Sequence, residues 1–139
     1  MPDLTPTTFP APLQSGALDI VGDVHGELDA LHDLLARLGY DKDGSHPDHR
    51  HLVFVGDLGD RGPDSPGVIR EVAGMVQTGR AQCVLGNHEL SLLRGVTKPG
   101  NGWFFATDHD QARGEFRDCQ PATAADREAF VDFIATLPL

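Results

Sequence analysis

The sequence has few cysteines and no long apolar run. These two features exclude disulfide-rich, zinc-finger and membrane-spanning proteins. Its two cysteines, Cys83 and Cys119, form neither a disulfide framework nor a zinc-finger spacing. No stretch approaches the roughly 18 consecutive apolar residues of a membrane span. Residues 1–14 lack the basic flank and apolar core of a signal peptide. We therefore expect a protein of the reducing cytoplasm that does not enter membranes.

Basic residues are also few. The chain has 11 lysines and arginines against 21 aspartates and glutamates, which gives a formal net charge of -10. Such a surface repels nucleic-acid phosphates, so we expect no extended nucleic-acid binding. A small phosphate ester is still compatible with this charge, because bound metal ions invert the local potential.

The length and the placement of proline predict the domain organisation. A chain of 139 residues is enough for one domain and too short for two. Residues 1–15 contain four prolines, which oppose both helix and central strand, so they form an irregular leader. Residues 16–139 form a single domain, and a hydrophobic content of 40% can support its core.

Three short, β-prone apolar runs are present, and each is followed by a glycine and then by side chains that bind metals or transfer protons. The runs at 17–21, 51–55 and 81–85 lead into the motifs GDVHG (22–26), GDLGDRG (56–62) and GNHE (86–89). A spacing of about thirty residues suits strand–helix–strand units, and parallel strands present functional groups at their carboxyl ends. We therefore expect one crevice that collects Asp23, His25, Asp57, Asn87 and His88.

Apolar residues recur at helical spacing after the first two motifs and again near the carboxyl end of the chain. Glycines then give plausible ends for the first two helices. The expected elements are a helix from Glu27 to Gly39, a second helix ending at Gly79, a short helix at 89–94, a loop at 97–110 and a last helix from Ala124.

The three motifs resemble the amino-terminal signatures of the calcineurin-like metallophosphoesterases. In this order they are most similar to the protein serine/threonine phosphatase branch and to its small bacterial relatives, which include diadenosine tetraphosphatases. The resemblance implies an α/β fold, namely the N-terminal βαβαβ half of an αββα sandwich. It also implies an enzyme that hydrolyses phosphoester or phosphoanhydride bonds with a metal-activated water. Its substrate would be a phosphorylated small molecule, a nucleotide or a phosphoprotein.

The same resemblance implies a site for two divalent metal ions. The ligands would be Asp23, His25, Asp57 and Asn87, with the Asp57 carboxylate bridging the two ions. Two ions held in this way can activate a water at neutral pH and neutralise a phosphoryl group. Mixed oxygen and nitrogen ligands suit manganese, iron or zinc, and manganese is typical of the bacterial relatives.

Catalytic roles are implied for the residues between and after the ligands. His88 would donate a proton to the leaving oxygen or stabilise the transition state, and Asp60 would orient His88. Arg61 would clamp the substrate phosphate through its planar guanidinium, and Asn87 would contribute to the same phosphate site.

The sequence departs from the family pattern after His88. Relatives supply two further histidines from later strands, whereas this chain has only His109, which no predicted strand precedes. We therefore expect a domain that is incomplete at its carboxyl end, with a weaker second metal position and an open sheet edge suited to self-association. The alternative function is a truncated, non-catalytic remnant that binds metal or a partner.

Each motif taken alone also has a purely structural explanation. Residues 23–25 could be a turn with a helix cap, residues 57–61 a surface ion-pair cluster, and residues 87–88 a helix cap. The aromatic residues 103–105 suit either a lip that stacks on substrate or packing in the core. The histidines expected to be solvated are His32, His46, His49 and His51.

Overall fold

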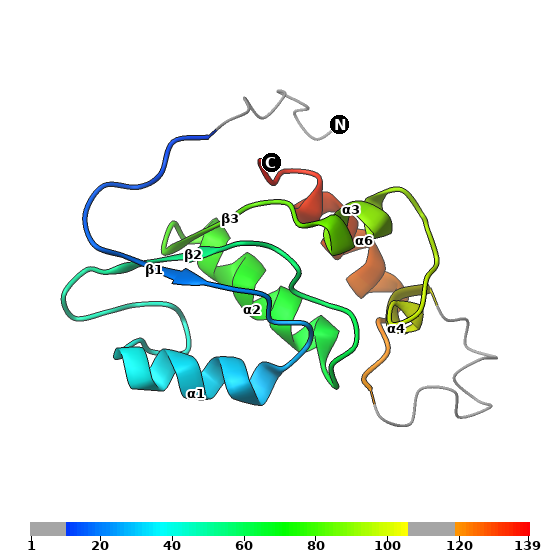
Figure 1. The fold of residues 1–139 in the computed structure, drawn as a ribbon, viewed down its shortest axis with the longest axis horizontal. Coiled ribbons are helices and arrows are strands. Elements are labelled where there is room, and N and C mark those ends of the chain that lie inside the picture. The colour runs from blue at the N-terminus through cyan, green and yellow to red at the C-terminus, as the bar shows by residue number, and fades with distance from the viewer. Residues whose placement is uncertain (1–10, 106–118) are drawn as a thin grey trace.

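The structure is a computed structural model that describes residues 11–105 and 119–139. Three strands form one parallel sheet in the order β1-β2-β3 (Figure 1). The strands are β1 (Leu18–Val21), β2 (His51–Phe54) and β3 (Ala81–Cys83). Helix α1 (Leu28–Leu38) connects β1 with β2, and helix α2 (Ser65–Gln77) connects β2 with β3. The predicted α/β class with a βαβαβ order is therefore confirmed.

Three further helices lie near the end of the sheet toward which the strands run (Figure 1). They are α3 (Asn87–Leu93), α4 (Gly102–Phe105) and α6 (Ala124–Ile134). Helix α6 packs against both α2 and α3. In the described part of the chain, every helix is too short or too polar to cross a membrane.

Local sequence signals set the helix ends. Helix α1 stops at Gly39, whose φ of 87° is the left-handed conformation that glycine adopts without a steric penalty. The Asp64 carboxylate accepts a hydrogen bond from the Gly67 N–H at 2.9 Å, which caps the start of α2. The Thr123 hydroxyl accepts from the Asp126 N–H at 3.0 Å at the start of α6. The predicted end of the first helix at Gly39 and the predicted start of the last helix at Ala124 therefore agree with the structure.

One face of the sheet builds the hydrophobic core. Side chains alternate between the two faces of a strand, and Val21, Leu52 and Phe54 are buried in one cluster with α2. Burying a side chain of this size contributes about 1.5–3 kcal/mol. The residues of α2 in that cluster are Val68, Ile69, Val72 and Met75.

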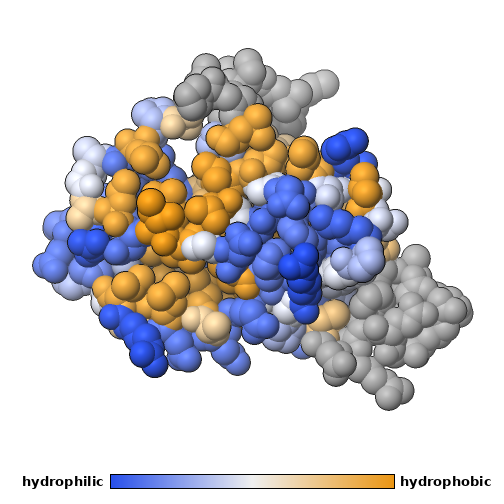
Figure 2. All heavy atoms as spheres, in the orientation of Figure 1, coloured by the Kyte–Doolittle hydropathy of each residue, from blue (hydrophilic) through white to orange (hydrophobic). Residues whose placement is uncertain are grey.

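The opposite face of the sheet is partly open. Ile20, which precedes Val21 on β1, is 69% exposed, and Val55, directly after β2, is 37% exposed. Figure 2 shows a broad apolar area on the face of the molecule where the strands lie. Within residues 11–105 and 119–139, β1 has a hydrogen-bonded strand on one side only. A free edge beside an apolar face is a surface on which other chains can pair.

Two local expectations are wrong. Residues 102–105 form α4 rather than a loop, and the short third helix begins at Asn87 rather than at residue 89. Trp103 and Phe104 are buried, with ring centroids 5.5 Å apart, so these two aromatic side chains pack in the core. The rest of the expected loop, including His109, lies outside the described residues.

The outlying histidines are less solvated than expected. Nε2 of His32 lies 2.7 Å from Oε1 of Glu71, so this pair joins α1 to α2. Nε2 of His46 lies 3.0 Å from a backbone oxygen at the end of α1. His51 is half-buried, and only His49 is exposed. The sequence could not reveal these partners because they come from other elements of the fold.

Candidate metal and phosphate site

The three motifs follow the carboxyl ends of β1, β2 and β3, and backbone hydrogen bonds join the first two loops. The N–H groups of Val24 and His25 both donate to the carbonyl of Asp57, at 3.1 and 3.0 Å. The N–H of Gly26 donates to the carbonyl of Leu58 at 2.8 Å. The backbones of these two loops are therefore held together by hydrogen bonds between their peptide groups.

Several site residues adopt a left-handed backbone that side-chain-bearing residues rarely adopt. The φ angles are 46° at His25, 51° at Asp57, and 72° at both Asp60 and Arg61. Such conformations cost on the order of 1–3 kcal/mol each and persist only where the surrounding structure enforces them. Gly56 has a φ of 88° and cannot be replaced by another residue, because a Cβ there would collide with the backbone of the third motif.

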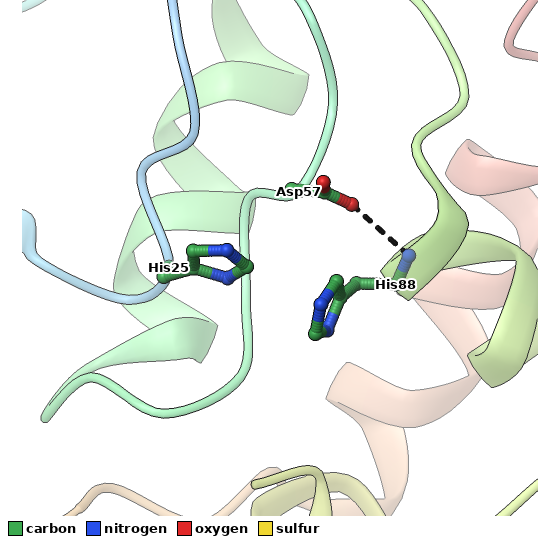
Figure 3. Close-up of side chains that lie close together, drawn as sticks. All are labelled: His25, Asp57 and His88. Atoms are coloured by element: carbon green, nitrogen blue, oxygen red, sulfur yellow. Dashed lines mark hydrogen bonds between the residues drawn. The ribbon is translucent and has the colours of Figure 1, made fainter.

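His25, Asp57 and His88 form a cluster that can bind a metal ion. One ligand atom from each residue lies within 4.8 Å of the others. Figure 3 shows the two imidazoles and the carboxylate around a shared space, with the backbone N–H of His88 donating to Oδ1 of Asp57 at 3.0 Å. The two imidazole rings meet edge to face, with centroids 4.7 Å apart.

The surroundings of His25 leave one of its nitrogens available as a ligand. Nδ1 lies 2.9 Å from the carbonyl oxygen of Gly59, so the ring N–H donates there. Nε2 then carries the lone pair that a metal needs. Oδ2 of Asp23 lies 3.6 Å from this Nε2. Nitrogen and carboxylate donors arranged in this way suit manganese, iron or zinc, so the residues present fit a divalent ion.

Asp60 is fully buried and connects two side chains. Its Oδ2 lies 2.7 Å from Nδ1 of His88, and its Oδ1 accepts a hydrogen bond from the Trp103 indole at 2.8 Å. The hydroxyl of Ser65 accepts from the backbone N–H of Asp60 at 2.9 Å. These contacts exclude the alternative of a surface ion-pair cluster, because Asp60 has no exposed surface.

Glu89 is a structural member of the site that the sequence analysis did not assign. Its carboxylate accepts hydrogen bonds from the N–H groups of Asp57 (2.7 Å), Leu58 (2.6 Å) and Gly86 (3.1 Å). Burial raises the pKa of this carboxyl, while the backbone N–H groups of Leu58 and Asp57 oppose that change. Glu89 thereby ties the second motif to the third. The only sequence signal was its place in GNHE, which gives no hint of partners about thirty residues earlier.

The remaining assigned residues lie around this cluster. Asp23 is more than half exposed, and Asn87 is exposed at the first position of α3. Arg61 is also exposed and lines a pocket of about 340 Å³. The helix-cap alternatives do not fit, because the cap positions of α1 and α3 are Glu27 and Gly86.

Sequence comparisons agree with this geometry. The family model of the calcineurin-like phosphoesterases matches residues 17–139. A bis(5′-nucleosyl)-tetraphosphatase from Halalkalibacterium halodurans, described as asymmetrical, is 56% identical over 79 residues, which are 55% of this chain and 32% of that protein. A symmetrical bis(5′-nucleosyl)-tetraphosphatase from Ralstonia nicotianae is 43% identical over 83 residues, covering 58% of this chain and 26% of that protein. The chain thus spans about a third or less of the length of these relatives.

Solved structures give the same fold. One described as a diadenosine tetraphosphatase matches 92% of this chain and 46% of its own, with a TM-score of 0.54 and 29% identity. A cold-active protein tyrosine phosphatase from Shewanella matches 84% of this chain and 38% of its own, with a TM-score of 0.52, and its 22% identity shows the fold alone. With three motifs at three strand ends and a family match over residues 17–139, the chain belongs to the calcineurin-like phosphoesterases.

Proposed function

We propose that the protein is a metal-dependent phosphohydrolase that acts on nucleotide phosphoanhydrides. The observation that carries the proposal is the convergence of His25, Asp57 and His88 within 4.8 Å, with His88 held by a buried carboxylate. A pure packing arrangement has no reason to bring two imidazoles and a carboxylate together at strand ends.

The proposed roles follow from the contacts of each residue. Of the cluster, His25 and Asp57 would hold a divalent ion together with Asp23, which lies beside His25, and His88 would be left for proton transfer. Asn87 would add a neutral ligand for a second ion. When bound, the ions supply an activated water and neutralise the phosphoryl charge. His88, whose Nδ1–H donates to Asp60, would carry the proton for the leaving oxygen on Nε2 in its doubly protonated form. Arg61 binds the phosphate, aided by Asn87.

The similar proteins support the nucleotide class of substrate. Two of them are bis(5′-nucleosyl)-tetraphosphatases that are 56% and 43% identical to this chain over the matched segments. We infer that the chain takes the same chemical class, in preference to a phosphoprotein. Manganese is the proposed metal, and the cytoplasm is the proposed location.

The test is hydrolysis of p-nitrophenyl phosphate and of a dinucleoside tetraphosphate with added Mn²⁺. We expect activity that requires metal and falls at least about a hundredfold in Asp57→Asn, because the carboxylate would be a metal ligand. Asp33→Asn, on the exposed side of α1, is the matched control and keeps full activity. Metal-independent activity, or an active Asp57→Asn variant, would refute the proposal.

A second candidate function is a metal-binding remnant without catalysis. The observation that favours it is that the described residues hold one group of three potential ligands, which is enough for a single ion. Metal stoichiometry separates the two candidates. Two ions per chain by equilibrium dialysis with Mn²⁺ support the enzyme, whereas one ion together with no turnover supports the remnant.

A further inference from the structure

A pocket of about 340 Å³ is lined by the end of the second motif and carries two cationic side chains. Arg61 and Lys98 are its charged residues, and the aromatic side chain is that of Trp103. The chain contains only two lysines among its 139 residues, so a lysine in this pocket is notable against a net charge of -10. The volume is at the low end of the roughly 300–1,000 Å³ range of ligand pockets.

Lys98 is carried by a turn that a buried asparagine organises. Asn101 has no exposed surface. Its Oδ1 accepts from the Lys98 N–H at 2.9 Å, its Nδ2 donates to the Val96 carbonyl at 2.9 Å, and its own N–H donates to the Lys98 carbonyl at 3.2 Å. Three hydrogen bonds from one buried side chain and its backbone fix the backbone position from which Lys98 projects.

The same turn is attached to the second motif. The N–H of Arg61 donates to the carbonyl of Gly100 at 3.0 Å. Gly100 has a φ of 93°, and a Cβ there would press on the Arg61 side chain at 3.2 Å from Cγ. Both cations of the pocket are therefore held on one connected piece of backbone.

The pocket is linked to the cluster through Asp60. Trp103 lines the pocket and donates to Oδ1 of Asp60, while Oδ2 of Asp60 faces His88. His88 and a residue that lines the pocket are thus separated by one carboxylate, which puts the pocket within reach of a phosphate chain whose reacting group lies at His88. A monoester has nothing charged to place there, whereas a polyphosphate chain has further phosphate groups.

We propose that Lys98 is a specificity-determining residue that binds a non-reacting phosphate of a polyphosphate substrate, while Arg61 binds the phosphate nearer to the reaction. This inference rests on the proposed phosphohydrolase function. An ammonium group suits this task, since it binds phosphate as a compact point charge. The two cations thus give a local attraction for polyanions on a chain whose overall charge repels them.

The test measures binding of inorganic tripolyphosphate and of orthophosphate to the whole chain by calorimetry, at low salt with EDTA present. We expect tripolyphosphate to bind more tightly than orthophosphate. Lys98→Gln weakens tripolyphosphate binding about tenfold, the effect of losing one charge-assisted hydrogen bond. Lys98→Arg keeps the affinity within about threefold, because it keeps the charge. Lys42→Gln removes the same charge at an exposed position of the 41–50 connection and leaves binding unchanged.

Three results would overturn the inference: equal affinity for the two anions, a Lys98→Gln variant that binds like the parent, or an equal loss in Lys42→Gln. Circular dichroism of each variant confirms the fold. Hydrolysis is measured separately with Mn²⁺, where Lys98→Gln lowers kcat/KM for a dinucleoside tetraphosphate about tenfold more than for p-nitrophenyl phosphate. Absence of hydrolysis in every variant, with Lys98-dependent binding intact, refutes the proposed function and leaves the binding subsite standing.

Discussion

Nδ1 of His88 lies 2.7 Å from Oδ2 of the fully buried Asp60. The carboxylate therefore receives the ring N–H and selects the tautomer with a free Nε2. In Asp60→Asn an amide N–H₂ facing Nδ1 favours the opposite tautomer. We expect kcat for a dinucleoside tetraphosphate to fall on the order of a hundredfold, with a smaller change in KM.

Steady-state kinetics with Mn²⁺ checks this expectation. Asp33→Asn on the exposed side of α1 removes an equivalent charge away from the site and serves as the control. A folded Asp60→Asn variant with unchanged kcat would show that the pair has only a packing role.

The carboxylate of Glu89 accepts three backbone N–H groups that hold Asp57 and its neighbours. Glutamine has a single acceptor oxygen, so Glu89→Gln leaves at least one buried N–H facing another donor. We expect a loss of about 1–3 kcal/mol in the free energy of unfolding and weaker Mn²⁺ binding. Urea denaturation and metal titration measure the two effects. Glu27→Gln, at an exposed cap position without a side-chain hydrogen bond, should change neither.

The ion pair of Asp19 with Arg50 makes the free energy of unfolding depend on pH in the acidic range. Hydrogen bonds from Arg50 first, and then from Tyr40, lower the pKa of the Asp19 carboxyl to about 2 from its ordinary 3.8. The ionised form is favoured in the folded state. The stabilisation is therefore complete above pH 4 and is lost as the pH falls through about 2.

Asp19→Asn tests this dependence. We expect it to lower the free energy of unfolding at pH 7 by about 1 kcal/mol, a modest value because Arg50 is partly exposed and water screens the pair. The difference from the parent should vanish near pH 2. Asp43→Asn breaks a more exposed pair with Arg80 and is the control. A difference that persists undiminished at low pH would contradict the assignment.

The apolar sheet face predicts self-association. Ile20 is 69% exposed on β1, beside a strand edge that has no partner in the described residues. We expect oligomers whose fraction rises with concentration in sedimentation velocity. Ile20→Lys should suppress them, because a charge on an edge strand opposes pairing. Leu34→Lys alters a 37% exposed leucine on α1 and should not. A parent chain that is monomeric at all concentrations would refute this expectation.

Much of the fold could be predicted because its signals are local. Three apolar runs ending in glycine predicted three parallel strands, and Gly39 marked the end of α1. The neighbourhood of His25, Asp57 and His88 also followed, since parallel strands end at one edge of the sheet.

The unpredicted features depend on contacts between distant residues. Nothing near Glu89 in the sequence indicates that its carboxylate reaches the turn at Asp57. The one-turn helix α4 could not be predicted because four residues show no periodicity. Its Trp103 is held by a hydrogen bond to Asp60, which lies more than 40 residues earlier in the sequence. Asn101 looks like an ordinary loop residue until its buried side chain is seen to close a turn.

The backbone hydrogen bonds between the first two loops have a consequence for chelation. Because Val24, His25 and Gly26 all donate to the second loop, the ligand frame is built by the peptide chain and not by the ion. A chelator should therefore strip the metal without unfolding the domain, unlike a zinc finger. The metal ion should then rebind at the rate of ligand exchange, because the domain does not have to refold. Its affinity should not be reduced by the entropy lost when a chain becomes ordered.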